Sequence, residues 1–403
     1  MFCSAILSLS VIIHLTSAIV QSPVQGPLKG FNYNPDDDAA TLFPLVKNEL
    51  PKIGAPGFTS ARLYTAVDPN SANAVPHPAF KAAGDTGTAV LIGLAVSLGN
   101  ASFQKELTAL TAVLEDKSGT YGNLVSKNLI VGISVGNEDF YRQSIQGTPQ
   151  AATQGAGSQP PIIMYQINQV RQKLAQQTPS LASKIPVGHA DTWQMWTKEE
   201  YGKQLLTAHP EQGGFQPVDF VGMQEFLYWE GYDVHNWTAY RTEALATVKS
   251  LAGNIPVWAT ETGWPVSGDA KCCDGPPTDA GMPGLLAWPG NDEAEVYWKG
   301  VGCETLFAGT GNDARNTWWY RVFASTAKSA QADGKLSWQV LSGVQGSSGA
   351  TAAFPLDCSA PAPSVPVPVS QKSTGSLGVS RILADWRLMV LSVVFVRCLC
   401  YSV

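Results

Sequence analysis

Features that would place this chain in several common functional classes are missing from its 403 residues. No metal-binding or nucleotide-binding motif occurs, so we expect neither a metal ion nor a cofactor. Lys and Arg number 26 against 32 Asp and Glu, and the net charge of −6 disfavours binding to nucleic acid. The apolar run Leu388–Val396 is interrupted by Arg397 and is too short to predict a membrane-spanning helix.

The N-terminus carries a pattern typical of secretion. Residues 1–18 contain the apolar run Ala5–Leu15 and end in small residues, Thr16-Ser17-Ala18, although an early Lys or Arg is absent. This pattern predicts a secretory signal peptide. Sequons at Asn100 and Asn236 fit a secreted glycoprotein.

The C-terminus has the order of a lipid-anchor signal. Small residues at Ser373-Thr374-Gly375 precede a polar spacer and the apolar tail. We therefore expect a glycosylphosphatidylinositol anchor on Ser373, removal of 374–403, and attachment to a membrane through lipid alone at the cell surface. A poor transmembrane helix or a fortuitous tail is the alternative. Residues 346–373, rich in Ser, Pro and Ala, predict a stalk without a core.

Four cysteines remain when both ends are removed: Cys272, Cys273, Cys303 and Cys358. An even number in an oxidising compartment predicts two disulfides, for which three connectivities are possible. A bridge between neighbours is strained, so we expect the adjacent pair to bond outward to the other two. Without nearby histidines, the adjacent pair is a poor metal site.

Residues 19–345 are long enough for one barrel domain. Apolar strand-like runs alternate with helical patterns, which favours parallel pairing over a sandwich and predicts an α/β fold, a (β/α)8 TIM barrel. The eight predicted strands are Lys29–Asn34, Phe58–Thr65, Thr88–Ser97, Leu129–Glu138, Ile185–Trp193, Val218–Tyr228, Ile255–Glu261 and Thr317–Phe323.

Two of these strands end in glutamate, at Glu138 and Glu261. A carboxylate that closes a buried strand is costly to ionise unless it is paired or functional. In a barrel of this type all strand ends meet on one face, where catalytic groups lie. Two carboxyl groups there suggest glycoside hydrolysis, with one acid and one attacking group. The alternative is that each carboxylate merely caps the next helix.

Three motifs together resemble fungal members of glycoside hydrolase family 17: Val135–Arg142, Gly188–Trp193 and Glu261–Pro265. The resemblance extends from about Gly30 to Trp338. These relatives are secreted, often anchored glucan endo-1,3-β-glucosidases. The resemblance implies a β-1,3-glucan substrate, a retaining mechanism, Glu138 as acid/base and Glu261 as nucleophile. We expect the protein to act as a monomer.

Further side chains are expected to bind substrate or support the glutamates. Asn137 can donate its amide to the sugar 2-hydroxyl, and Arg62 and Tyr64 could hold Glu261 ionised, unless each pairs with a structural carboxylate. Trp264 is expected to wall a sugar subsite, with packing in the core as the alternative. Tyr33 and Tyr228 are additional candidate substrate contacts.

The chain departs from the family pattern at two strands. The sixth usually reads Tyr-Pro-Tyr-Phe but is Phe226-Leu227-Tyr228-Trp229 here, and the acidic end of the eighth is replaced by residues 320–325. The sixth strand thus lacks a hydroxyl at Phe226 that could steady the nucleophile, and the eighth lacks three carboxylates that could bind sugar hydroxyls. We expect intact catalytic chemistry with altered subsite specificity and rate. A hydrolase, a transglucosylase using the same site, and a non-catalytic glucan-binding wall protein therefore all remain open.

Overall fold

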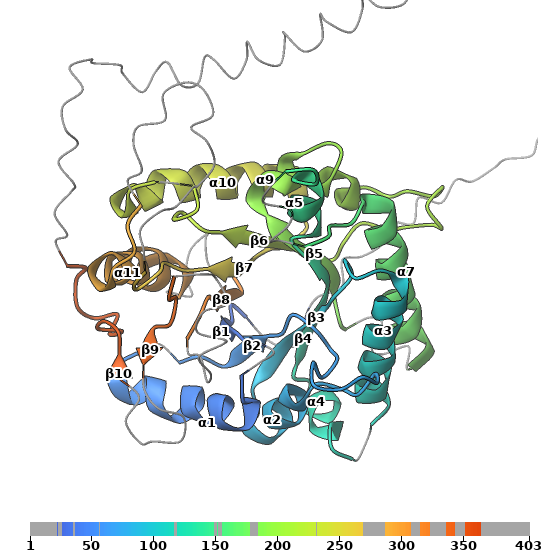
Figure 1. Cartoon of the computed structure of the whole chain (residues 1–403), viewed down its shortest axis with the longest axis horizontal. Helices are drawn as coiled ribbons and strands as arrows, with labels where there is room; N and C mark the ends of the chain where they lie inside the picture. Colours follow the sequence, from blue (N-terminus) through green and yellow to red (C-terminus); the bar gives the residue numbers. More distant parts are fainter. Residues whose placement is uncertain are drawn as a thin grey trace, which may run out of the picture. The chain divides into compact units, whose positions relative to one another are not determined.

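Eight parallel strands pair in sequence order, and the last returns to the first to close a barrel (Figure 1). The predicted (β/α)8 barrel is confirmed, and each predicted strand contains an observed one or overlaps it. The strands are β1 Lys29–Asn32, β2 Ser60–Arg62, β3 Ala89–Leu94, β4 Ile130–Asn137, β5 Val187–Thr192, β6 Val221–Glu225, β7 Val257–Thr262 and β8 Thr317–Trp319.

This computed structural model describes residues 22, 26–34, 37–55, 57–116, 119–148, 151, 155–177, 184–230, 232–268, 287–307, 315–322, 336–342 and 351–363. The predicted signal peptide, Ser373 with the anchor signal, and the Cys272-Cys273 pair lie outside these residues. In the described part of the chain, no helix is long and apolar enough to cross a membrane.

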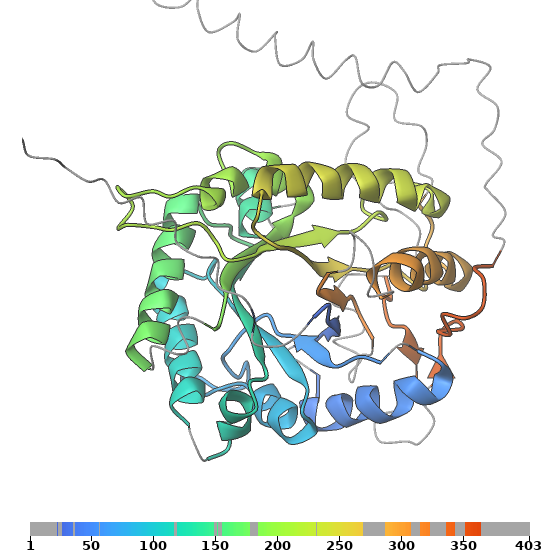
Figure 2. The same cartoon turned by 180° about the vertical axis from the view of Figure 1, so that it is seen from behind.

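Helices surround the strands, as Figures 1 and 2 show from opposite sides. They are α1 Ala39–Glu49, α2 Pro78–Thr86, α3 Asn100–Glu115, α4 Gly122–Ser126, α5 Asp139–Ser144, α7 Pro160–Gln177, α9 Trp193–Thr197, α10 Trp237–Ala252 and α11 Asn291–Tyr297, with 3₁₀ turns η1 Leu50–Ile53, η2 Gly202–Leu206 and η3 Val234–Asn236 and the π-helix η4 Trp298–Leu306. The Asp38 carboxylate accepts a hydrogen bond from the Ala40 amide and caps α1. Asn100 and Asn236 of the two sequons are exposed.

Strand composition explains why the barrel forms. Every residue of β3 and β7 is buried, and β4 is buried until its last residue. Apolar side chains of the strands pack with the buried stripes of α1, α3 and α7 in one large core. Five of the strands carry a polar residue at or near the C-terminal end, and these residues meet at one end of the barrel.

The segment after residue 350 is part of the fold, which corrects the predicted start of the stalk at residue 346. The strand β10, Thr351–Ala352, pairs antiparallel with β9, Leu341–Ser342. Beyond it Phe354 and Leu356 are buried, and the Trp298 indole donates a hydrogen bond of 3.1 Å to the Leu356 carbonyl. A composition rich in Ser and Ala concealed these few anchoring residues.

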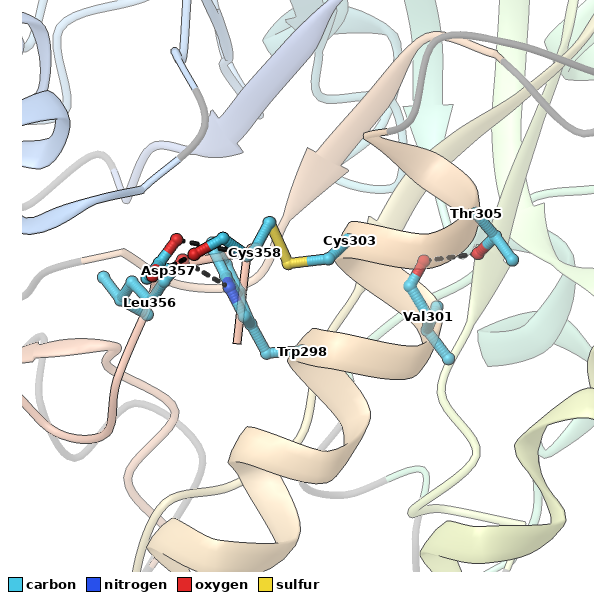
Figure 3. The surroundings of a disulfide bond; sticks show 8 residues. Trp298, Val301, Cys303, Thr305, Leu356, Asp357 and Cys358 are labelled. Atoms are coloured by element: carbon cyan, nitrogen blue, oxygen red, sulfur yellow. Dashed lines mark hydrogen bonds between the residues drawn. A yellow bond between two sulfur atoms is a disulfide. The ribbon is translucent and has the colours of Figure 1, made fainter. Parts of the chain in front are cut away.

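A disulfide joins Cys303 to Cys358, with the two Cα atoms 5.3 Å apart (Figure 3). The expectation that each would pair with a member of the Cys272-Cys273 pair is therefore wrong. Packing of Leu356 against Trp298 brings Cys358 onto the π-helix η4, one turn from that tryptophan. This path of the chain is a tertiary property that cysteine spacing does not reveal.

We expect the double variant Cys303→Ser/Cys358→Ser to lose about 4 kcal/mol of unfolding free energy, since the bond closes a loop with a sequence separation of 55. Guanidinium titration against the oxidised wild type measures the loss. Replacing both cysteines leaves neither free to pair elsewhere, and Ser359→Ala beside the bond is the control. A loss under about 1 kcal/mol would show that packing alone holds this segment.

Candidate active site

Polar side chains form a layer across the C-terminal end of the barrel. The layer comes from the ends of five strands, β1, β2, β4, β6 and β7, and consists of Asn32, Arg62, Asn137, Gln224 and Glu261. Four of these residues are buried, and Asn137 is partly exposed. Strand register places these residues at the same level of the barrel, because Asn32 pairs with Arg62 and Gln224 pairs with Glu261.

Arg62 and Glu261 form a buried ion pair at the centre of the layer. Arg62 Nη1 lies 2.5 Å from Glu261 Oε1, and the two side chains are 1% and 6% exposed. The same guanidinium donates to Asn32 Oδ1 at 3.1 Å and to Asn137 Oδ1 at 2.6 Å. Burial of two charges is stabilised only when such additional bonds are made. The predicted role of Arg62 beside Glu261 matches this geometry.

Gln224 is a site residue that sequence reasoning missed. Its Nε2 donates to Glu261 Oε1 at 2.9 Å and to Asn137 Oδ1 at 2.7 Å. Gln224 therefore supplies a hydrogen bond to Glu261 from β6, where Phe226 has no hydroxyl to offer one. Phe226 instead packs edge-on against Tyr320 and Trp338. The sequence offered only a weak signal for Gln224, a polar residue near the end of a predicted strand.

The backbone at Glu138 has an unusual conformation that projects this residue from the strand. Its φ of 55° and ψ of 27° lie in the left-handed region, which is uncommon for a residue with a side chain. Its amide donates to the Ala190 carbonyl and its carbonyl accepts from the Arg142 amide, both at 2.9 Å. Such outliers concentrate at functional sites, where the surrounding structure holds them.

Buried acidic side chains hold this turn. Asp139 accepts a hydrogen bond of 2.7 Å from the Asn137 amide, and Asp191 accepts one of 2.8 Å from the Phe140 amide at the start of α5. The ring of His189 bridges the Asp191 carboxylate and the Val135 carbonyl. His189, Ala190 and Asp191 of the Gly188–Trp193 motif thus support the turn at Glu138.

Gly136 is required by the same arrangement. Its φ is +91°, a conformation that other residues rarely adopt. A Cβ atom at this position would collide with Asp139 Oδ2 and approach the His189 ring. The glycine therefore allows these two side chains to lie directly beneath the turn.

The two glutamates have opposite electrostatic surroundings. Burial and, second, the charge of Glu261 raise the pKa of Glu138 well above its ordinary value, while Arg142 opposes the shift from 3.7 Å. Glu261 instead receives charge-assisted hydrogen bonds from Arg62 and Gln224, which favour its ionised form. This arrangement can donate a proton from Glu138 and present an anion at Glu261.

Tyr64 lies close to both carboxyl groups. Burial and the charges of Glu261 and Glu138 raise the pKa of its hydroxyl well above the usual value, although Arg62 acts in the opposite direction. The Arg62 guanidinium lies 4.8 Å from the centre of the tyrosine ring. The hydroxyl has no hydrogen-bond partner among the described residues. Tyr64 is thus a neutral donor at the site.

Three predicted substrate contacts are buried supports instead. Trp264 is 1% exposed, lies against Tyr228 and Tyr297, and donates its indole N–H to the Trp288 carbonyl at 2.8 Å. Tyr228 is fully buried, and Tyr33 is buried with its hydroxyl bonded to the Asp37 carbonyl. None of the three presents a face to a ligand, because neighbouring aromatic rings cover them.

The altered eighth strand places a cation where the family pattern has an acid. Arg321 is 3% exposed and lies 3.9 Å from the Asp37 carboxylate. Its charge also lowers the pKa of Tyr64, against the larger effect of burial. Residues 323–335, which include the rest of this altered stretch, lie outside the described part of the chain.

Nothing in the described residues resembles a metal centre, since they hold no group of three or more His, Cys, Asp or Glu side chains suited to a metal ion. The groups that line the end of the barrel are carboxyl groups, amides and a guanidinium.

Comparison with known proteins adds a family to this geometry. The family model described as the BtgE/BtgC glycoside hydrolase domain matches residues 30–328. The chain is 37% identical over 320 residues to the probable glucan endo-1,3-beta-glucosidase eglC of Aspergillus terreus, covering 76% of this chain and 57% of that protein. For the protein of the same name from Aspergillus fumigatus the identity is 34%, over 76% of this chain and 62% of that protein.

These comparisons confirm the resemblance drawn from the glutamate motifs. The chain spans about three fifths of the length of the curated relatives that it matches. Among solved structures, an endo-laminarinase from Formosa Hel1_33_131 superposes with a TM-score of 0.51 at 12% identity, over 80% of this chain and 84% of that chain. That likeness supports the barrel fold.

We expect Glu261→Gln to lower the pKa of Glu138, because it removes the nearby negative charge and frees Arg62 to favour ionised Glu138. Burial remains, so the pKa stays above the ordinary value for glutamate. Carbon-13 NMR titration of labelled glutamate carboxyl groups measures the change. Glu199→Gln, at a side chain that is 84% exposed, is the control. An unchanged pKa would show that the two carboxyl groups are not coupled.

Proposed function

Because the chain belongs to the BtgE/BtgC glycoside hydrolase family, we propose that it hydrolyses β-1,3-glucan by double displacement, with Glu138 as acid/base and Glu261 as nucleophile. The observation that carries the proposal is the electrostatic difference between the two carboxyl groups. Glu138 is partly exposed and has a raised pKa, whereas the buried Glu261 accepts hydrogen bonds from Arg62 and Gln224 that favour its ionised form. The names of the curated relatives support the choice of substrate.

In the first step, the Glu261 carboxylate attacks the anomeric carbon of the sugar and the glycosidic bond breaks. Glu138 gives its proton to the departing oxygen, so no alkoxide forms. The raised pKa of Glu138 keeps this proton available toward neutral pH. The product is a glycosyl ester on Glu261 with the opposite anomeric configuration.

In the second step, water breaks that ester and restores the original configuration. Once Glu261 is esterified it carries no charge, so one cause of the raised pKa of Glu138 disappears. Glu138 is then ionised more readily and accepts the proton of the attacking water. The same carboxyl group therefore serves as acid and then as base.

Asn137 is suited to bind the sugar beside the reacting carbon. Its Oδ1 accepts hydrogen bonds from Arg62 and Gln224, which fixes the orientation of the amide. Its Nδ2 has no partner among the described residues and is left to donate to a ligand. A donor at this position fits the 2-hydroxyl contact that strengthens in the transition state.

Glu138→Ala and Glu261→Ala should each lower laminarin hydrolysis by about a thousandfold. Azide added with β-laminaribiosyl fluoride should rescue each variant with a different product. Without Glu261, azide attacks the donor directly and gives the α-azide; without Glu138, it attacks the glycosyl-enzyme and gives the β-azide. Proton NMR identifies the anomers, and Glu199→Ala is the control. The opposite assignment of products would reverse the two roles, and full activity in either variant would remove the proposal.

Gln224→Met should lower kcat on laminarin about tenfold, because Glu261 and Asn137 both lose a donor. The ionised form of Glu261 is then less favoured, so the acidic limb of the pH profile should move to higher pH. Gln176→Met, on the exposed side of α7, is the matched control. If the acidic limb of the pH profile does not move, Gln224 contributes only to packing and not to the ionisation of Glu261.

We also propose that the protein is secreted and held at the cell surface by a lipid anchor near Ser373. The support is the apolar N-terminal segment and the order of small residues, spacer and apolar tail at the C-terminus. A substrate in the cell wall would be within reach of an enzyme in this position.

A further inference from the structure

His189 is a fully buried, titratable side chain on β5 that takes no part in the catalytic steps described above. The centre of its ring lies 4.6 Å from that of Phe140 and 5.9 Å from that of Trp196. Its Nδ1 lies 2.7 Å from the Val135 carbonyl oxygen on β4, and its Nε2 lies 3.2 Å from Asp191 Oδ2. Each nitrogen of the buried ring therefore has one oxygen atom as its partner.

These two contacts fix the number of protons that the ring and its carboxyl partner hold. A carbonyl oxygen only accepts hydrogen bonds, so Nδ1 must carry the proton of the bond to Val135. The contact between Nε2 and Asp191 requires a second proton, because an unprotonated ring nitrogen and a carboxylate are both acceptors. The pair therefore holds one proton more than a neutral imidazole and an ionised carboxyl group would hold.

The other hydrogen bonds of Asp191 indicate where this second proton lies. The backbone amides of Phe140 and Thr192 each donate to its carboxylate at 2.8 Å, and the amide of Tyr141 donates at 3.3 Å. Donors of this kind favour the ionised form of a carboxyl group. The second proton then belongs to Nε2, and the ring is a cation. A buried cation is tolerated when it is paired in this way.

Two carboxyl groups lie beside the ring, Asp191 on the same strand and Asp139 at the start of α5. A Cβ atom added to Gly136 would collide with Asp139 Oδ2 and approach the ring of His189, so these two side chains are neighbours. Burial raises the pKa of Asp139, and the positive charge of His189 is the first of the opposing causes, followed by Arg142. The ring therefore acts on both acids.

The charge of the same pair also reaches Glu138. Burial and the charge of Glu261 are the main causes of the raised pKa of Glu138, and the charge of Asp191 acts in the same direction. The charges of Arg142 and Arg62 oppose it. A cation bonded to Asp191 leaves that pair without net charge, so it offsets the effect of the carboxylate on Glu138.

We propose that His189 is held as an imidazolium cation and is a positioning residue for Glu138, because its charge balances that of Asp191 beneath the turn. The inference rests on the proposed function. In the second step of that reaction Glu138 has to be ionised before it can accept the proton of water. An unopposed charge on Asp191 would hinder this ionisation.

Nitrogen-15 NMR of histidine-labelled wild type measures the charge of the ring directly. At about pH 7, both ring nitrogens of His189 should be protonated and should have the chemical shifts of an imidazolium cation. Contacts between its ring protons and those of Phe140 identify the residue. The resonance of an unprotonated nitrogen at either position would overturn the inference.

His189→Gln keeps a donor for Asp191 but cannot carry a charge. The pKa of Glu138, followed by carbon-13 NMR of its carboxyl group, should rise by about one pH unit. The basic limb of kcat/KM on laminarin should move to higher pH with it. His189→Gln/Asp191→Asn again has no net charge, so both values should return to within about 0.3 pH unit of wild type. His209→Gln, at a partly exposed histidine bonded to Glu211, is the matched control.

The double variant separates the charge of the ring from its packing. Loss of packing would damage the double variant at least as much as His189→Gln, whereas the balance of charge restores the pKa of Glu138. A pKa that does not rise in the single variant, or does not return in the double variant, would overturn the inference. The nitrogen-15 measurement needs no variant, so it is decisive even if His189→Gln does not fold.

The same measurements separate this inference from the proposed function. A wild type that cleaves no β-1,3-glucan, but whose ring is charged and whose Glu138 responds as described, would remove the proposed function alone. An active wild type with an uncharged ring would overturn the role of His189 alone.

Discussion

The buried ion pair between Arg62 and Glu261 is the constraint on which the rest of the site depends. Two charges removed from water destabilise a fold unless their remaining hydrogen-bonding atoms are satisfied. Asn32, Asn137 and Gln224 supply most of that satisfaction. Each of these residues lies at the end of a different strand. Closure of the barrel therefore brings together the partners that stabilise the charge on Glu261.

Glu138 is constrained in the opposite way. Its turn is held by the Asp139 and Asp191 carboxylates and by the Arg142 guanidinium, which donates a hydrogen bond to the Asn137 carbonyl and lies 3.7 Å from the Glu138 carboxylate. The difference between the glutamates therefore follows from which strand neighbours carry donors. Desolvation and the charge of Glu261 outweigh Arg142 and raise the pKa of Glu138, whereas the hydrogen bonds from Arg62 favour the ionised form of Glu261.

The two glutamates and the barrel were predictable because each is a local signal, an apolar run that ends in a polar residue. Gln224 was not, since its position against Glu261 depends on a register shift between Met223 and Gln224 in the pairing of β6 with β7. Trp264 was misassigned for a related reason. An aromatic residue after a strand fits a sugar platform or a core equally well, and the neighbouring rings decide between them.

Arg321 shows how one departure from a family pattern alters its surroundings. Arg321 is buried and forms an ion pair with Asp37, which an acid in the same place could not do. The charge of Arg321 also lowers the pKa of Tyr64, against the larger effect of burial, so this replacement acts on a residue close to both glutamates. The Arg62, Gln224 and Glu261 contacts do not involve it. The proposed catalytic residues therefore keep their hydrogen bonds to one another, although the residue that follows the eighth strand has changed.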